Sequence, residues 1–158
     1  MKPADPFNCS VAATLDIIGE GWTLLIIREA FLGTRRFADF QRHLGIARNI
    51  LSDRLKKLTR HAILKRVPIG PGAKRHEYRL TGKGRELLPL LVALTQWGDR
   101  WINPDGAPLT MVDRRDGLPI RPLQIQAADG RPLGLHDLAL APGPGASEAT
   151  LARLKALK

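Results

Sequence analysis

The stretch that decides the fold is RNILSDRLKKL, residues 48–58. Leu51, Leu55 and Leu58 recur at i, i+4 and i+7, and this spacing predicts a helix with one apolar side. Because successive residues turn by ~100°, the short polar and long basic side chains point away from the leucines. Side chains of these kinds can reach base edges and phosphates in a DNA groove. The stretch therefore predicts a recognition helix over residues 47–61.

Three predicted helices precede the recognition helix. The sequence indicates helices over residues 9–18 and 22–32, each followed by glycine. A short third helix that includes Phe37 and Leu44 stops at Gly45. The step from this helix to the recognition helix has the length of a helix-turn-helix turn.

A glycine-rich basic hairpin follows the recognition helix. Residues 64–69 have the composition of a strand, and residues 76–80 alternate with period two, as a partner strand does. The turn between them carries two cations, Lys74 and Arg75. This order of elements predicts a winged helix that reads duplex DNA, with the hairpin as its wing.

A long helix and a region of short apolar runs follow the hairpin. Thr81 is expected to cap a helix that reaches Ile102 and that Pro89 kinks by removing one backbone hydrogen bond. After this helix, two Asp-Gly pairs separate the short runs, which predict a small β meander. The chain then ends in a Pro- and Gly-rich spacer and a short helix capped by Ser147. The strand-like runs are residues 109–112, 118–120, 123–126 and 138–140.

The predicted fold class is α+β, in three parts. Residues 1–104 form a winged-helix DNA-binding domain with a long C-terminal dimerisation helix. Residues 105–140 form a β-hairpin extension, and residues 141–158 form a flexible spacer and a short terminal helix.

The charge of the chain is concentrated in one segment. Residues 33–85 hold 15 Lys and Arg against three acidic residues, a net charge of +12, whereas the whole 158-residue chain carries +10. A localised positive charge is typical of a protein that binds a polyanion. The alternative is a basic surface that serves solubility.

The sequence gives little support to a membrane protein, a secreted protein, a metalloprotein or an enzyme. No apolar run approaches the ~20 residues of a membrane span, no signal-peptide segment is present, and the single cysteine cannot form an internal disulfide. We therefore expect a cytoplasmic protein with no membrane partner. The four histidines have no metal-binding spacing, and no nucleophile elbow, phosphate loop or carboxylate pair occurs. These observations predict no metal, no cofactor and no enzymatic activity.

Eight basic or polar residues are the candidate DNA contacts. Asn49 can pair with adenine and Arg48 with guanine or phosphate, while wing cations suit phosphates or a minor groove. Arg54 lies near the flank of the recognition helix, where it contacts phosphate or braces the third helix. The full set is Arg36, Arg48, Asn49, Ser52, Arg54, Lys56, Lys74 and Arg75.

The long helix carries a broad apolar stripe. Two tryptophans and several leucines form more apolar surface than one small domain can easily hide, which predicts a homodimer interface. The alternative is that this helix packs on the C-terminal meander. The stripe includes Leu87, Leu91, Leu94, Trp97 and Trp101.

In order and spacing, these pieces resemble the HxlR family of bacterial transcription regulators. The likeness covers about residues 7–102 and rests on Cys9, residues 15–22, 36–40, 48–58 and 78–84, Trp97 and Trp101. It implies a dimeric repressor or activator of promoter DNA, with the first helix, and so Leu15, and the long helix in the dimer contact.

The resemblance also bears on cysteine chemistry. It implies that Cys9 can sense an oxidant or electrophile, the alternative being a small buried apolar residue. Some relatives carry zinc-binding cysteines in the extension, but residues 116–117 and 126–130 here hold none. Because thiolates make such sites tight, no zinc is expected.

Several alternatives stay open. The candidate signals for the regulator are an unknown small-molecule effector and an oxidant. Two rival functions are a winged-helix protein-interaction module that does not bind DNA and a redox-reactive protein centred on Cys9.

Overall fold

The computed structural model describes residues 9–70 and 75–157. These residues fall into two compact units, which we describe separately. The first unit runs to Glu86 and resumes at Leu140, and the second is Leu87–Ala139.

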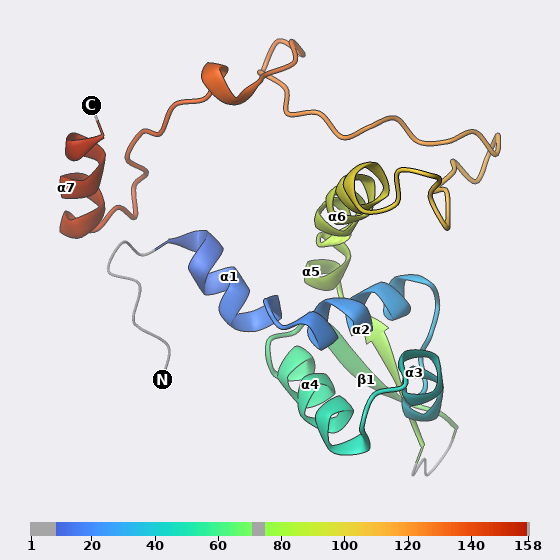
Figure 1. Cartoon of the computed structure of the whole chain (residues 1–158). Coiled ribbons are helices and arrows are strands. Elements are labelled where there is room, and N and C mark those ends of the chain that lie inside the picture. Colours follow the sequence, from blue (N-terminus) through green and yellow to red (C-terminus); the bar gives the residue numbers. More distant parts are fainter. Residues whose placement is uncertain (1–8, 71–74, 158) are drawn as a thin grey trace. The chain divides into compact units, whose positions relative to one another are not determined.

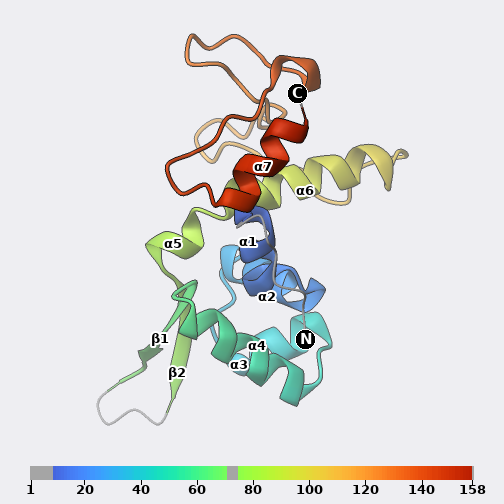
Figure 2. The same cartoon turned by 90° about the vertical axis from the view of Figure 1, so that its left-hand side faces the viewer.

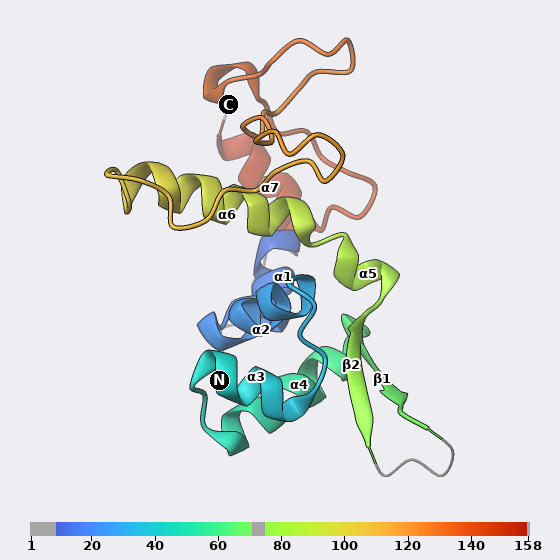
Figure 3. The same cartoon turned by 90° about the vertical axis from the view of Figure 1, so that its right-hand side faces the viewer.

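The first unit has the element order of a winged helix, as predicted (Figure 1). Its strands pair antiparallel, from Leu64 opposite Leu80 to Pro68 opposite His76. In Figures 2 and 3, α3, α4 and the hairpin lie at one end of this unit, and α1 and α7 lie toward the other. The elements are α1 (Ser10–Ile18), α2 (Gly21–Phe31), α3 (Phe37–Leu44), α4 (Arg48–Arg60), β1 (Leu64–Pro68), β2 (His76–Leu80), α5 (Gly82–Arg85) and α7 (Glu148–Ala156).

The core of this unit is built around the predicted apolar side of α4. Leu51, Leu55 and Leu58 are at most 1% exposed, which confirms the assignment from their spacing. They are buried together with Ile26 and Ile27 of α2 and with residues of α3 and β1. Burying each such side chain contributes roughly 1.5–3 kcal/mol, so this layer fixes the orientation of the whole helix.

Tight connections set the helix-turn-helix and the wing. Gly45 ends α3 with a φ of 62°, a left-handed conformation that glycine adopts without strain. The N–H of Tyr78 in β2 donates to the carbonyl of Arg35 at 2.8 Å. The ring of Tyr78 also lies edge-on to that of Phe40 in α3. The wing is therefore tied to the segment that leads into α3.

The long helix expected from Thr81 to Ile102 is interrupted. Thr81 caps α5 as predicted, accepting a hydrogen bond from the N–H of Gly84 at 3.0 Å, but α5 ends at Arg85. The helix α6 (Leu88–Trp101) then begins, with Pro89 in its first turn. The prediction of a kink inside one helix was wrong. A new helix begins just before Pro89 instead, because proline costs least in a first turn, whose N–H groups lack helical acceptors.

The extension holds tight turns but no meander. The Asp-Gly turns form as predicted, and each is closed by a single bridge, Val112 with Pro119 and Gln126 with Pro132. Residues 138–140 form no strand, and η1 (Leu135–Asp137) is a short 3-10 helix. The predicted sheet was wrong. Pro119 lies inside one run, Pro108 and Pro122 stand directly before two others, and a proline has no N–H to donate to a strand ladder.

No single helix in the described ranges is long and apolar enough to cross a membrane, and the one pair that passes such a test together, α1 and α2, is bent by 77°.

Candidate nucleic-acid interface

The outward side of α4 carries the predicted base-reading residues. Arg48, Asn49 and Lys56 are exposed and Ser52 is half-buried, while the leucines of the same helix are buried. The helix begins at Arg48 with no side-chain cap. Its first-turn N–H groups are therefore available to a phosphate, at the end of the helix dipole that favours an anion.

Arg48 is held in place by the neighbouring helix. Its guanidinium lies over the ring of Phe37 in α3, 5.4 Å from the ring centroid. An arginine stacked in this way keeps its planar donors free to bind a guanine edge or a phosphate. The sequence placed both residues at helix starts, but their contact depends on how α3 and α4 cross.

Two other predicted contacts come together in one cleft. Arg36, the residue before α3, and Arg75, the residue before β2, line a hollow of about 360 Å³ with Ile69 and His76. Among the described residues, this lining has two guanidinium groups and no carboxylate, a combination that suits a phosphate. Lys74, the other predicted wing contact, lies outside the described residues.

Arg54 has a different environment from its neighbours on α4. Its guanidinium pairs with the carboxylate of Glu20, the residue before α2, and Lys57 reaches the same carboxylate at 3.5 Å. The side chain of Arg54 is 25% exposed. Arg54 therefore braces the start of α2. The sequence had suggested that it braces the third helix instead. Its role toward phosphate stays a prediction.

A buried polar cluster joins α2 to α3, and sequence reasoning missed it. Glu29 is 7% exposed and accepts hydrogen bonds from Thr34 and, at 2.9 Å, from Arg28, while the Nδ1 of His43 lies 3.1 Å from its carboxylate. The signal in the sequence that could have revealed this cluster is a glutamate among the apolar residues of α2.

The electrostatics of this cluster favour a charged carboxylate. Burial by itself raises the pKa of Glu29, but hydrogen bonds from Arg28, Thr34 and His43 and the charge of Arg28 hold that pKa below its ordinary value. The cluster thus fixes α3 on α2, and α3 in turn positions Phe37 at its start and Arg36 directly before it.

The predicted dimer residues are available for a partner. Leu15 of α1 is 51% exposed, and Leu94, Trp97 and Trp101 of α6 are exposed to similar extents. Leu87, just before α6, is half-buried, and so is Leu91. Cys9 is exposed immediately before α1, and its carbonyl accepts from the N–H of Ala13.

Among residues 9–70 and 75–157, no three His, Cys, Asp or Glu side chains gather where they could hold a metal ion.

Comparison with known proteins places this arrangement in a family context. The family model described as HxlR-like helix-turn-helix matches residues 17–106. An uncharacterised HTH-type transcriptional regulator of Mycobacterium tuberculosis, Rv3095, is 42% identical over 137 residues, which are 86% of this chain and 87% of that protein. The crystal structure of PA1607, described as a candidate transcription factor, is 46% identical, with a TM-score of 0.81 over 86% of this chain and 96% of that one.

A solved structure of lower sequence identity matches only part of this chain. The redox regulator HypR in its reduced form is 29% identical, with a TM-score of 0.54. The match covers 99% of HypR but 61% of this chain. More than a third of the present chain thus has no counterpart in HypR, whereas PA1607 matches most of it.

Proposed function

This chain is a transcriptional regulator that belongs to the HxlR-like helix-turn-helix family, and we propose that it represses transcription by binding an inverted-repeat promoter site as a homodimer. The observation that carries the proposal is the outward polar side of α4, which begins with Arg48 stacked on Phe37. A protein of this kind, bound across a promoter, excludes other proteins from that DNA.

The proposed DNA-binding residues fall into two groups, those that contact bases and those that contact the phosphate backbone. We assign base contacts to Arg48, Asn49, Ser52 and Lys56, because these side chains lie on the side of α4 that the core leaves open. The cleft with Arg36 and Arg75 is assigned to a backbone phosphate.

The homodimer is supported by exposed apolar surface. Leu94, Trp97 and Trp101 recur on one side of α6 and are 47%, 59% and 62% exposed. Apolar side chains grouped in this way mark a protein contact. A two-fold dimer would place its two α4 helices in successive major grooves, with half-sites about 34 Å apart or a multiple of it.

Redox control is a second proposal, supported by a separate observation. Cys9 is exposed at the start of α1, whose Leu15 is one of the proposed dimer residues. HypR, to which this chain is similar, is a redox regulator. Oxidation of Cys9 in two protomers to an intersubunit disulfide, or with a small thiol, would change the α1 contact. A Cys9→Ser variant should then bind DNA equally before and after an oxidant, whereas the parent chain should not.

The proposal is tested by competition between DNA duplexes. The full chain is bound to a labelled duplex from its own upstream region that contains an inverted repeat, and unlabelled competitors are added. We expect the intact repeat to compete at least about 1,000-fold better than a scrambled duplex. Equal competition by both duplexes would contradict specific recognition, and no binding to either would favour the protein-interaction module.

A further inference from the structure

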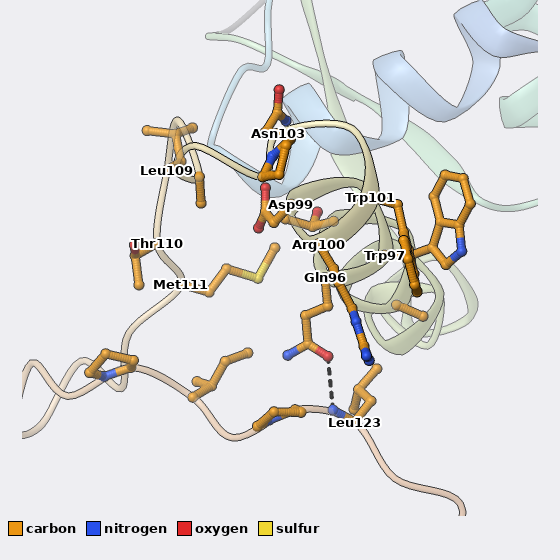
Figure 4. A pocket seen from close by; sticks show the side chains of 18 residues that line it. Gln96, Trp97, Asp99, Arg100, Trp101, Asn103, Leu109, Thr110, Met111 and Leu123 are labelled. Carbon is orange, nitrogen blue, oxygen red and sulfur yellow. Dashed lines mark hydrogen bonds between the residues drawn. The ribbon is translucent and has the colours of Figure 1, made fainter.

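The second unit contains a groove that the DNA-binding proposal does not use. It lies between α6 and the segment of residues 104–123, has a volume of about 700 Å³, and is lined mostly by apolar side chains (Figure 4). A volume of this size is typical of sites for small organic molecules. The apolar lining includes Leu109, Met111, Ile120 and Leu123.

The groove and the proposed dimer contact share Trp97 and Trp101, which line the groove, but otherwise use different sides of α6. Gln96, Asp99 and Asn103 follow each other at i, i+3 and i+7 along the groove. Trp97 and Trp101 border the groove, but the indole of Trp101 points away from Met111 and Thr110 in Figure 4. A ligand in the groove therefore leaves the leucines of the apolar stripe, which are not part of the lining, open to a partner.

The far wall of the groove is fixed to the helix by hydrogen bonds. The side chain of Gln96 accepts from the N–H of Leu123 at 2.8 Å and donates to the carbonyl of Arg121 at 3.2 Å. Both polar ends of one side chain thus bind the backbone opposite. This connection forms the groove before any ligand enters, which lowers the entropy lost on binding.

Two charged side chains line the groove, Asp99 and Arg100. Asp99 is half-buried, it points toward Met111 in Figure 4, and it makes no hydrogen bond or ion pair with another described residue. Arg100 is exposed, and its guanidinium lies 4.9 Å from the ring centroid of Trp101. Because a less hydrated charge interacts more strongly, Asp99 is the stronger partner for a ligand.

We propose that this groove binds a small aromatic or apolar amine, whose ring contacts Met111 and Ile120 and whose ammonium group binds Asp99. The inference rests on the proposed function, because the amine would act there as an effector. It would shift α6, and with it the dimer contact that includes Trp97 and Trp101, and so change the spacing of the two α4 helices.

Three probes with one ring system test the charge preference. The full chain is titrated calorimetrically with 1-naphthylmethylamine, 1-naphthalenemethanol and 1-naphthoic acid, which carry a positive, a zero and a negative charge. We expect the amine to bind about five- to tenfold more tightly than the alcohol, and the acid most weakly. Asp99→Asn should remove the advantage of the amine, and the matched control Asp105→Asn, an exposed acid outside the lining, should keep it.

A second variant tests the location. Ile120→Trp adds bulk inside the groove and should weaken all three probes. Equal binding of the three probes, tightest binding of the acid, or an unchanged preference in Asp99→Asn would overturn the inference.

DNA binding without a probe separates this inference from the proposed function. If the chain prefers the amine but binds no promoter DNA, the proposed function is refuted, and the assignment of the groove to an amine stands. A chain that binds promoter DNA but shows no amine preference would refute the groove alone.

Discussion

Arg48 and Arg54 show how two arginines on one helix acquire different roles. Arg48 stands at the first position of α4 with its guanidinium over Phe37, whereas Arg54 pairs with Glu20 before α2. The leucine spacing placed both arginines off the buried side of α4, but only the packing of α2 beside it separates them. Sequence reasoning could therefore predict that Arg48 is exposed, but not that Arg54 pairs with Glu20.

Arg48→Ala is expected to weaken binding to the specific promoter duplex by ~1–3 kcal/mol, because it removes a guanidinium held beside the bases. The measurement is fluorescence anisotropy with specific and scrambled duplexes. The matched control is Arg114→Ala, which removes one exposed arginine from the extension. Equal losses in the two variants would show that Arg48 acts through net charge alone.

Glu29→Gln is expected to lower the free energy of unfolding by ~1–2 kcal/mol at neutral pH, because it breaks charged hydrogen bonds in a buried cluster. The folded-state pKa of Glu29 lies below its ordinary value of 4.5. The stabilisation is therefore fully present above that value and is lost as the pH falls through the lower folded-state pKa.

Denaturant unfolding of the parent and Glu29→Gln between about pH 3 and pH 7 checks this dependence. The difference in unfolding free energy should be largest at neutral pH and should shrink in acid. Glu86→Gln, at an exposed carboxylate, is the control and should track the parent throughout. A constant difference for Glu29→Gln would contradict a charged, stabilising carboxylate.

Helices and strands were predicted correctly where the residues that cause them lie close together in the sequence. The leucine spacing gave α4, Gly45 gave the end of α3, and period-two alternation gave β2, all within residues close in sequence. The break before α6 and the missing meander depend on where prolines are tolerated. Sequence reasoning gave Pro89 a kink instead of a place in a first turn, and it did not weigh the prolines of the extension. The Glu29 cluster required contacts between α2 and α3 that no local pattern reports.

The wing is expected to contribute charge rather than sequence preference. Arg75→Ala should lower the slope of log affinity against log salt concentration by about one unit, because one phosphate contact and its released counterion are lost. Binding of specific and scrambled duplexes should weaken alike. An unchanged slope, compared with Arg114→Ala as the control, would show that the cleft of Arg36 and Arg75 stays empty on DNA.

At the scale of the whole molecule, the exposed stripe of α6 should join two protomers. Leu94→Asp places a charge where the partner would bury an apolar side chain, so it should raise the dimer dissociation constant by about tenfold or more. Sedimentation equilibrium measures this constant directly. Leu32→Asp, at a leucine 66% exposed after α2, is the control. A dimer unchanged by Leu94→Asp would place the interface elsewhere.

The central claim is that the basic winged-helix unit binds duplex DNA. The most direct measurement is a mobility-shift titration of the full chain with its own upstream promoter duplex across a salt series. We expect tight binding that falls steeply and linearly on logarithmic axes, with a slope that corresponds to several phosphate contacts. Binding that is absent, or that does not change with salt despite a net charge of +12 over residues 33–85, would contradict the account.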